Sequence, residues 1–124
     1  MPSVLLVEDD DQLRALLKLV LISSGYDVWE ASSGKGVERL YQQHHPDLVV
    51  TDLMMPEKDG LEVIMDLRRQ DPKVKILAIS GGGPRSPEID LRMAQKLGAV
   101  STLSKPFLDT EFVEAVRLVL EPGR

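Results

Sequence analysis

The chain has 124 residues, of which 43% are hydrophobic and 28% are charged, and this composition is typical of one globular domain spanning residues 1–124. Its formal net charge of −5 at pH 7 disfavours direct binding to nucleic acid or to an anionic membrane surface. The chain contains no cysteine, which excludes a disulfide framework and a thiolate metal site and fits a reducing compartment.

Five short runs along the chain are predicted to form strands. The first, residues 4–7, is ended by acidic residues far too early for a signal peptide or a membrane span, so we expect a cytoplasmic protein. Residues 48–50 and 76–79 are continuous apolar runs, which is typical of strands covered on both faces. Asp27–Ala31 and Ser101–Ser104 are less apolar and are predicted to lie nearer the edges of the sheet.

Between and after these runs, apolar residues recur at helical spacing. Asp10 or Asp11 is expected to cap the first helix and Gly25 to follow its end, while Asp109 or Thr110 is expected to begin the last helix. The five apolar stripes are Leu13, Leu16, Leu17, Val20 and Leu21; Val37, Leu40, Tyr41 and His44; Leu61, Ile64 and Leu67; Ile89, Met93 and Leu97; and Phe112, Val113, Val116, Val119 and Leu120.

Strands that alternate with helices are the pattern of βαβ units, which build parallel sheets covered by helices on both faces. The sequence therefore predicts an α/β fold with one doubly wound parallel sheet. No internal repeat, low-complexity segment or linker interrupts this pattern.

Charged and hydroxyl side chains stand at the ends of four predicted strands. Glu8 and Asp9 follow the first strand, Asp52 the third and Ser80 the fourth, and Lys105 follows the fifth. The carboxyl ends of parallel strands share one edge of the sheet, where open α/β sheets bind their ligands. We therefore expect these side chains to meet in space and to form one site.

The three acidic residues of this edge predict a metal ion. Carboxylates a few ångströms apart repel one another unless positive charge compensates, and Lys105 together with a divalent cation would supply that charge. Oxygen ligands select a hard cation, and Mg²⁺ binds through only one or two carboxylates and keeps several waters. We expect Asp9 and Asp52 to bind Mg²⁺ directly and Glu8 to act mainly through a bound water.

Three segments, LLVEDD, DLMMPEKDG and SKPF, resemble the signature segments of the receiver domain of bacterial response regulators. They occur in the family's order, each at the end of the appropriate strand, and the resemblance covers the whole chain. It implies a flavodoxin-like (βα)5 sheet with strand order 2-1-3-4-5. It also implies that a histidine kinase or a histidine phosphotransfer protein donates a phosphoryl group, and that a downstream protein target reads the phosphorylated state.

The resemblance gives each site residue a role. Asp52 is the nucleophile that becomes phosphorylated, and Lys105 contacts a phosphoryl oxygen. The Ser80 hydroxyl and the Gly81 N–H are expected to donate hydrogen bonds to another phosphoryl oxygen. The main-chain carbonyl of Met54 is expected to be a further Mg²⁺ ligand. The protein should assist its own phosphorylation and dephosphorylation without being an enzyme that acts on external substrates.

Two features depart from the family pattern. Thr102 stands three residues before Lys105, where the family usually has a tyrosine or phenylalanine that turns inward on activation. The segment after Ser80 is longer than usual and begins with three glycines at 81–83, which serve either as a surface insertion or as a hinge. The peptide bond before Pro106 is expected to be cis, as in the family.

Other functions and sites fit the sequence less well. A degenerate receiver that docks proteins without phosphorylation remains the alternative, favoured by the missing aromatic residue at 102 and by the glycines. A hydrolase of small phosphate esters would need an acid at position 54, which is a methionine. A flavin phosphate would be repelled by the acids after the first strand. His44, His45 and Trp29 are expected to have structural roles.

Overall fold

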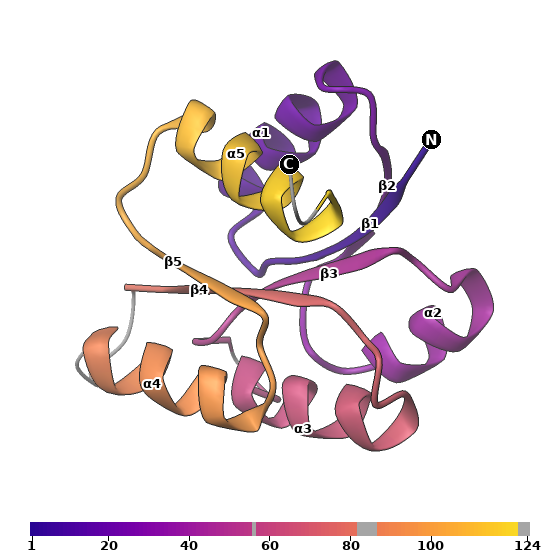
Figure 1. The fold of residues 1–124 in the computed structure, drawn as a ribbon, viewed down its shortest axis with the longest axis vertical. Coiled ribbons are helices and arrows are strands. Elements are labelled where there is room, and N and C mark those ends of the chain that lie inside the picture. The colour runs from indigo at the N-terminus through magenta and orange to yellow at the C-terminus, as the bar shows by residue number, and fades with distance from the viewer. Residues whose placement is uncertain (56, 82–86, 122–124) are drawn as a thin grey trace.

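The computed structural model describes residues 1–55, 57–81 and 87–121 of the chain (Figure 1). Strands and helices alternate along it, as predicted. The strands are β1 (Ser3–Val7), β2 (Asp27–Ala31), β3 (Leu48–Asp52), β4 (Ile76–Ser80) and β5 (Ser101–Ser104). The helices are α1 (Asp11–Ser23), α2 (Val37–His44), α3 (Gly60–Gln70), α4 (Pro87–Leu97) and α5 (Asp109–Leu120).

The five strands form one parallel sheet in the order β2-β1-β3-β4-β5. This confirms the predicted doubly wound, flavodoxin-like α/β fold and the placement of β2 and β5 at the edges. Helices α1 and α5 cover one face of the sheet and α2, α3 and α4 cover the other, as Figure 1 shows. None of the helices in the described part of the chain is long and apolar enough to cross a membrane.

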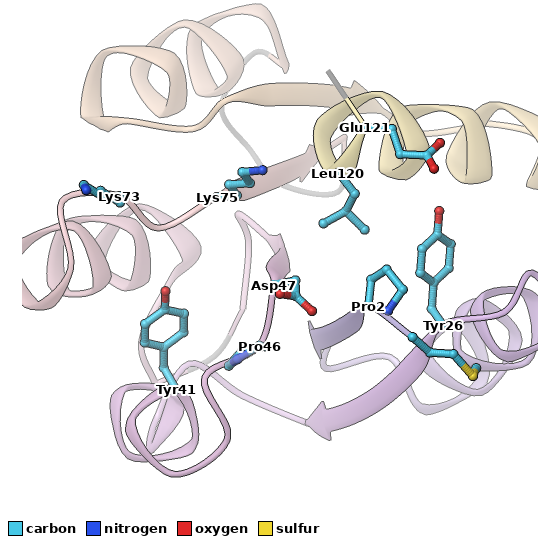
Figure 2. A pocket seen from close by; sticks show the side chains of 10 residues that line it. Pro2, Tyr26, Tyr41, Pro46, Asp47, Lys73, Lys75, Leu120 and Glu121 are labelled. Atoms are coloured by element: carbon cyan, nitrogen blue, oxygen red, sulfur yellow. The ribbon is translucent and has the colours of Figure 1, made fainter. Parts of the chain in front are cut away.

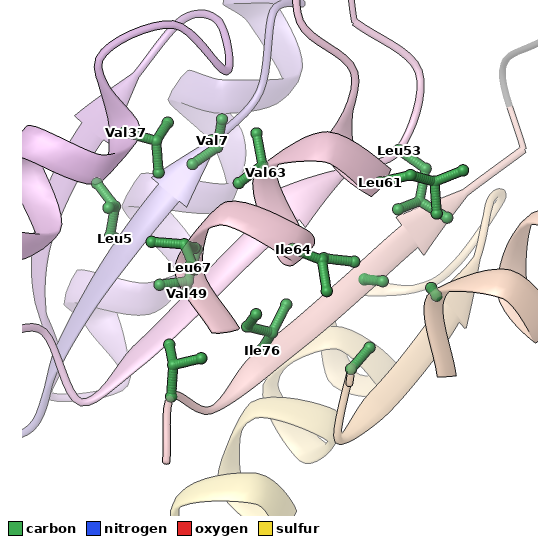
Figure 3. Close-up of a cluster of buried hydrophobic side chains, with 14 of the residues drawn as sticks. Leu5, Val7, Val37, Val49, Leu53, Leu61, Val63, Ile64, Leu67 and Ile76 are labelled. Atoms are coloured by element: carbon green, nitrogen blue, oxygen red, sulfur yellow. The ribbon is translucent and has the colours of Figure 1, made fainter. Parts of the chain in front are cut away.

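The central strands are buried because helices cover both of their faces. Every residue of β3 and β4 is buried, and so are the last four residues of β1. Alternate residues of β1, β3 and β4 contribute to two separate cores. Leu5, Val49 and Ile76 pack against α2, α3 and α4 (Figure 3), whereas Leu6 and Val50 pack against α1 and α5. The continuous apolar runs in the sequence therefore reflect burial on two faces rather than on one.

One predicted helix faces differently from its apolar pattern. The stripe of Ile89, Met93 and Leu97 was expected to pack on the sheet, but Ile89 is 55% exposed and Met93 is 41% exposed. The helix instead buries Asp90, which is 1% exposed, and Ala94, which is 0% exposed. The prediction of the buried face was therefore wrong, and only Leu97 packs partly against the core.

The helix ends follow the predicted signals where the structure describes them. Asp10 caps α1, since its side chain accepts hydrogen bonds from the N–H groups of Gln12 and Leu13. Helix α5 begins at Asp109, as expected. The peptide bond between Lys105 and Pro106 is cis, as the family resemblance implied. Two of the three glycines expected to form a surface insertion or a hinge, at positions 82 and 83, lie outside the described residues.

Replacing Asp10 with alanine should lower the free energy of unfolding by about 1 kcal/mol, because two N–H groups at the start of α1 lose their acceptor. Urea denaturation followed by circular dichroism measures the change. The matched control is Gln12→Ala, which changes an exposed side chain of the same turn and keeps the capped N–H. Equal urea midpoints for Asp10→Ala and the wild type would show that this cap does not stabilise the fold.

Candidate functional site

Two carboxylates and one lysine meet at the carboxyl edge of the sheet. Asp52 is the last residue of β3 and is 3% exposed, and Glu8 follows β1 and is 1% exposed. Lys105 follows β5, and its Nζ donates a hydrogen bond of 2.5 Å to Asp52 Oδ2. The same Nζ lies 3.6 Å from Glu8 Oε1. The ammonium group therefore bridges two buried acids that come from different strands.

Main-chain N–H groups hold the other oxygens of these acids. The N–H of Met54 donates to Asp52 Oδ1 at 2.9 Å, and the N–H of Asp10 donates to Glu8 Oε2 at 3.1 Å. Each carboxylate thus has one oxygen oriented by its own loop and one oxygen toward Lys105. These hydrogen bonds fix the orientation of the Asp52 side chain. That Asp52 and the Met54 carbonyl bind Mg²⁺ stays a prediction.

Asp9 completes an acidic cluster with Glu8 and Asp52. One ligand oxygen from each of these three residues lies within 4.8 Å of the others, and Asp9 is the exposed member. Burial raises the pKa of Glu8 to about 7, against the hydrogen bond from the Asp10 N–H, and the charge of Asp52 adds to the rise. Burial alone would lower the pKa of Lys105, but its hydrogen bond and charge interaction with Asp52 raise it.

The donor set fits a hard divalent cation. Glu8 Oε1 is buried and accepts no hydrogen bond from any residue that the structure describes, and the Lys105 ammonium 3.6 Å away compensates its charge only in part. Three carboxylates within 4.8 Å supply only oxygen ligands, the type that Mg²⁺ prefers. Asp9 gives the cluster a side open to solvent. Glu8, Asp9 and Asp52 are therefore the residues that could hold a metal ion.

Gly60 places the start of α3 directly against the backbone of Asp52. A Cβ atom at Gly60 would lie 2.2 Å from the Asp52 carbonyl oxygen and 2.7 Å from the Cα of Leu53. The Gly60 N–H also donates to the Leu53 carbonyl at 3.0 Å. This role was not foreseen from the sequence, although the segment DLMMPEKDG contains the residue. The Asp-Gly pair at the start of a predicted helix was the available signal.

Gly81 lies against Lys105. Its φ of +132° is in the region that favours glycine, and an added Cβ would lie 2.9 Å from the Lys105 Cβ. The N–H of Lys105 donates to the Ser80 carbonyl at 2.7 Å. The end of β4 and the residue that carries the ammonium group are therefore in direct contact, and Gly81 stands beside the site as expected.

The hydroxyl of Ser80 points to a residue that the sequence did not indicate. Ser80 is the last residue of β4 and is fully buried, and its Oγ donates to Asp90 Oδ2 of α4 at 3.4 Å. Asp90 had no place in the predicted site. Thr102 is only partly buried and pairs with Ala78 in the ladder between β4 and β5. The structure thus brings together Glu8, Asp9, Asp52 and Lys105, and turns the Ser80 side chain toward α4.

Trp29 and His44 lie on another part of the fold. Trp29 of β2 stacks on His44 of α2, with ring centroids 3.8 Å apart and an angle of 11° between the planes. Trp29 is 41% exposed. Such a stack holds the edge strand against α2, which fits the structural role expected for both residues.

A hollow opens at the amino-terminal ends of the strands, at the opposite edge of the sheet from the acidic cluster (Figure 2). Its volume is about 490 Å³, and it is lined by Met1, Pro2, Tyr26, Tyr41, Pro46, Asp47, Lys73, Lys75, Leu120 and Glu121. None of the acidic residues at the carboxyl edge lines it. Because its wall mixes two lysines with two acids and two tyrosines, it shows no preference for a ligand of one charge.

The sequence is similar to a known protein family and to proteins of known name. The profile of the family described as the response regulator receiver domain matches residues 4–117. The transcriptional regulatory protein AfsQ1 of Streptomyces coelicolor is 37% identical over 123 residues, which are 99% of this chain and 53% of that protein. The chemotaxis protein CheY of Thermotoga maritima is 35% identical over 117 residues, covering 94% of this chain and 95% of CheY. The chain thus spans about half of one relative and nearly all of the other.

Solved structures give the same result. The receiver domain of the Francisella response regulator 1452 is 27% identical, with a TM-score of 0.87 and coverage of 100% of both chains. The Vibrio cholerae chemotaxis protein CheY4 is 28% identical, with a TM-score of 0.86, and the match covers 97% of this chain and 99% of that chain.

Proposed function

Because this chain belongs to the response regulator receiver family, we propose that Asp52 accepts a phosphoryl group from a phosphohistidine. The donor is a histidine kinase or a histidine phosphotransfer protein, and phosphorylation changes the contacts of the chain with a downstream protein. The observation that carries this proposal is the Lys105 ammonium 2.5 Å from a buried Asp52 carboxylate, beside two further acids.

The chemistry needs a nucleophile held in place and positive charge beside it. A carboxylate oxygen of Asp52 forms a bond to phosphorus while the bond between phosphorus and the imidazole nitrogen breaks, and that nitrogen keeps the electron pair. The hydrogen bond from the Met54 N–H restricts the rotation of the carboxylate before the reaction. Phosphoryl transfer depends mostly on positioning and charge neutralisation. The Met54 N–H positions the carboxylate, and Lys105 supplies positive charge.

Positive charge must balance the incoming phosphoryl oxygens. Lys105 stands at the carboxylate already and can contact a phosphoryl oxygen without leaving the site. When bound by Glu8, Asp9 and Asp52, Mg²⁺ supplies the remaining charge neutralisation. Ser80 and the Gly81 N–H are the proposed hydrogen-bond donors to a phosphoryl oxygen, and the Met54 carbonyl is the proposed additional metal ligand.

Transfer changes the charge of the site. An Asp52 carboxylate with one negative charge becomes an acyl phosphate with a charge of about −2, so the edge of the sheet becomes more negative. The altered charge shifts a two-state equilibrium of nearby groups, and a partner that binds one state reads it. In this proposal the chain assists its own phosphorylation and dephosphorylation and acts on no external substrate. The proposed donor and the lack of cysteine both fit the cytoplasm.

Incubation with acetyl phosphate or phosphoramidate and Mg²⁺, followed by intact-mass measurement, tests the proposal. One phosphoryl group should appear, should be lost on treatment with hydroxylamine as an acyl phosphate is, and should map to Asp52. Chelation of Mg²⁺ by EDTA should prevent its appearance. If no group appears and beryllofluoride with Mg²⁺ leaves the amide NMR spectrum unchanged, the chain is a degenerate receiver that docks proteins without phosphorylation.

Mg²⁺ binding should strengthen with pH through the neutral range. Glu8, with a pKa of about 7 in the metal-free protein, is mostly protonated at pH 6 and mostly ionised at pH 8, and a cation binds the ionised form better. The Mg²⁺ affinity measured by calorimetry should therefore rise by up to about tenfold between these pH values. In Glu8→Gln this rise should vanish. An affinity that is equal at both pH values in the wild type would show that Glu8 does not contribute to the metal site.

Glu8 also makes the stability of the metal-free protein depend on pH. The pKa of Glu8 is higher in the folded chain than its usual value of 4.5, so the metal-free fold loses stability as the pH rises from that value through about 7. Saturating Mg²⁺ should reduce this loss because the cation compensates the ionised carboxylate.

A further inference from the structure

The inward side of α4 presents a carboxylate to the end of β4. Asp90 is 1% exposed and lies one helical turn before Ala94, which is fully buried on the same side of the helix. Asp90 Oδ2 accepts a hydrogen bond of 3.4 Å from the Oγ of the fully buried Ser80. This contact joins the strand end beside the proposed phosphorylation site to the first turn of α4.

A serine hydroxyl has one proton, so it donates one hydrogen bond at a time. In the structure the Ser80 Oγ lies 3.4 Å from Asp90 Oδ2 of α4, the distance of a hydrogen bond in which the hydroxyl donates. The proposed function requires the same hydroxyl to donate to a phosphoryl oxygen on Asp52. The two uses of the Ser80 proton exclude each other, and each belongs to a different state of the protein.

Ser80 lies beside the phosphorylation site at the carboxyl edge of the sheet. Asp52 pairs with Ile79 in the ladder between β3 and β4, and Ser80 is the next residue. A phosphoryl group with a charge of about −2 is a stronger acceptor than a carboxylate, and the present bond of 3.4 Å is long for a hydroxyl donor. Asp90 then loses this hydrogen bond while it is buried, which favours movement of the first turn of α4.

The side chain at position 102 cannot supply an aromatic contact to α4. Thr102 pairs with Ala78 on the side of the sheet that α4 covers, and it is a small side chain where the family usually has an aromatic ring. The contact from Ser80 to Asp90 connects β4 to α4 without passing through position 102.

We propose that Asp90 is a positioning residue that holds the Ser80 hydroxyl in the unphosphorylated state, and that phosphorylation of Asp52 withdraws this hydroxyl and releases the start of α4. The inference rests on the proposed function of Asp52. It makes Asp90 a competitor of the phosphoryl group for one proton, so removing Asp90 should favour the activated state.

The affinity for beryllofluoride, an acyl phosphate mimic, in the presence of Mg²⁺ tests the competition. Asp90→Ala should bind beryllofluoride on the order of five- to tenfold more tightly than the wild type, since one opposing hydrogen bond is removed. The matched control is Glu88→Ala, which removes an exposed acid from the same turn of α4 and should leave the affinity unchanged. Mg²⁺ affinity should be equal in all of these proteins, because Asp90 is outside the acidic cluster.

A double-mutant cycle separates this role from a merely structural one. In a Ser80→Ala background, Asp90→Ala should no longer change the beryllofluoride affinity, because no hydroxyl remains to be shared. In the amide NMR spectrum, the Ala94 signal of Asp90→Ala should lie, before beryllofluoride is added, near its position in the wild-type complex. If Asp90→Ala does not fold, the neutral isostere Asp90→Asn is measured instead and should change the affinity in the same direction by a smaller factor.

The possible results distinguish the two proposals. Beryllofluoride binding to the wild type with no gain in Asp90→Ala, or with an equal gain in the Ser80→Ala background, would overturn the role of Asp90 and leave the proposed function intact. No binding to the wild type in the presence of Mg²⁺ would overturn both.

Discussion

Asp52→Asn should take up no phosphoryl group from acetyl phosphate or from a phosphorylated donor protein. The amide oxygen is a far weaker nucleophile than a carboxylate, while the amide has nearly the same size and shape in its buried place. The loss should be complete within the sensitivity of intact-mass measurement, corresponding to a rate reduction of at least about a hundredfold. Mg²⁺ affinity should fall as well, because one of the three clustered acids loses its charge.

The matched control for this variant is Asp47→Asn, which changes an exposed acid at the opposite end of β3. It should be phosphorylated at the wild-type rate. Both proteins should have wild-type circular dichroism spectra, which separates loss of chemistry from loss of fold. Incorporation of phosphate into Asp52→Asn at the wild-type rate would move the acceptor to another residue and would remove the basis of the proposed function.

Gly60→Ala should lower the free energy of unfolding by about 1–3 kcal/mol and should also slow phosphorylation. The added Cβ would meet the Asp52 carbonyl oxygen at 2.2 Å, and main-chain atoms at a strand end cannot move aside as a flexible side chain can. Either α3 moves away from the sheet or the backbone that carries Asp52 shifts, and both change the geometry of the site. Urea denaturation measures the first effect, and phosphorylation by acetyl phosphate at a temperature where the variant is folded measures the second.

Glu62→Ala is the control for the change at Gly60. It places alanine in the first turn of the same helix, on its exposed side, and keeps the N–H that the Asp59 side chain caps. Its urea midpoint and phosphorylation rate should stay near those of the wild type. A wild-type midpoint for Gly60→Ala would show that α3 can move away from Asp52 without cost.

The architecture could be predicted because its signals lie within single segments. Apolar runs of strand length mark the central strands, and the helical spacing between them leads to a parallel sheet. The carboxyl edge then follows from topology alone, which is why the sequence predicts that Glu8, Asp52 and Lys105 lie together. The ion pairs among these three residues agree with that placement.

The orientation of α4 could not be predicted from hydrophobicity. The apolar pattern favoured a buried Ile89 and Met93, whereas the helix turns Asp90 and Ala94 toward the sheet. An alanine contributes little to such a pattern, and a charged residue is assigned to solvent unless a partner for it is known. One partner of Asp90 is Ser80, which lies ten residues earlier on another element.

The role of Gly60 was missed for a related reason. A glycine is required there by the space that the Asp52 carbonyl occupies, and this space exists only once β3 and α3 are packed together. Sequence spacing identifies glycines at turns through their backbone conformation, but a close approach between two elements becomes visible only in three dimensions.

Burial of the central strands on both faces also limits where this protein can diverge from its relatives. Residues inside β1, β3 and β4 are buried in the two cores and cannot contact another protein. The residues that select a signalling partner must therefore lie on the outer sides of the helices and on the loops. Paralogous domains in one cell can therefore keep a common interior and a common reaction while their outer layers drift apart. Grafting outward helix residues from one such paralogue to another should redirect the signal without altering the chemistry that produces it.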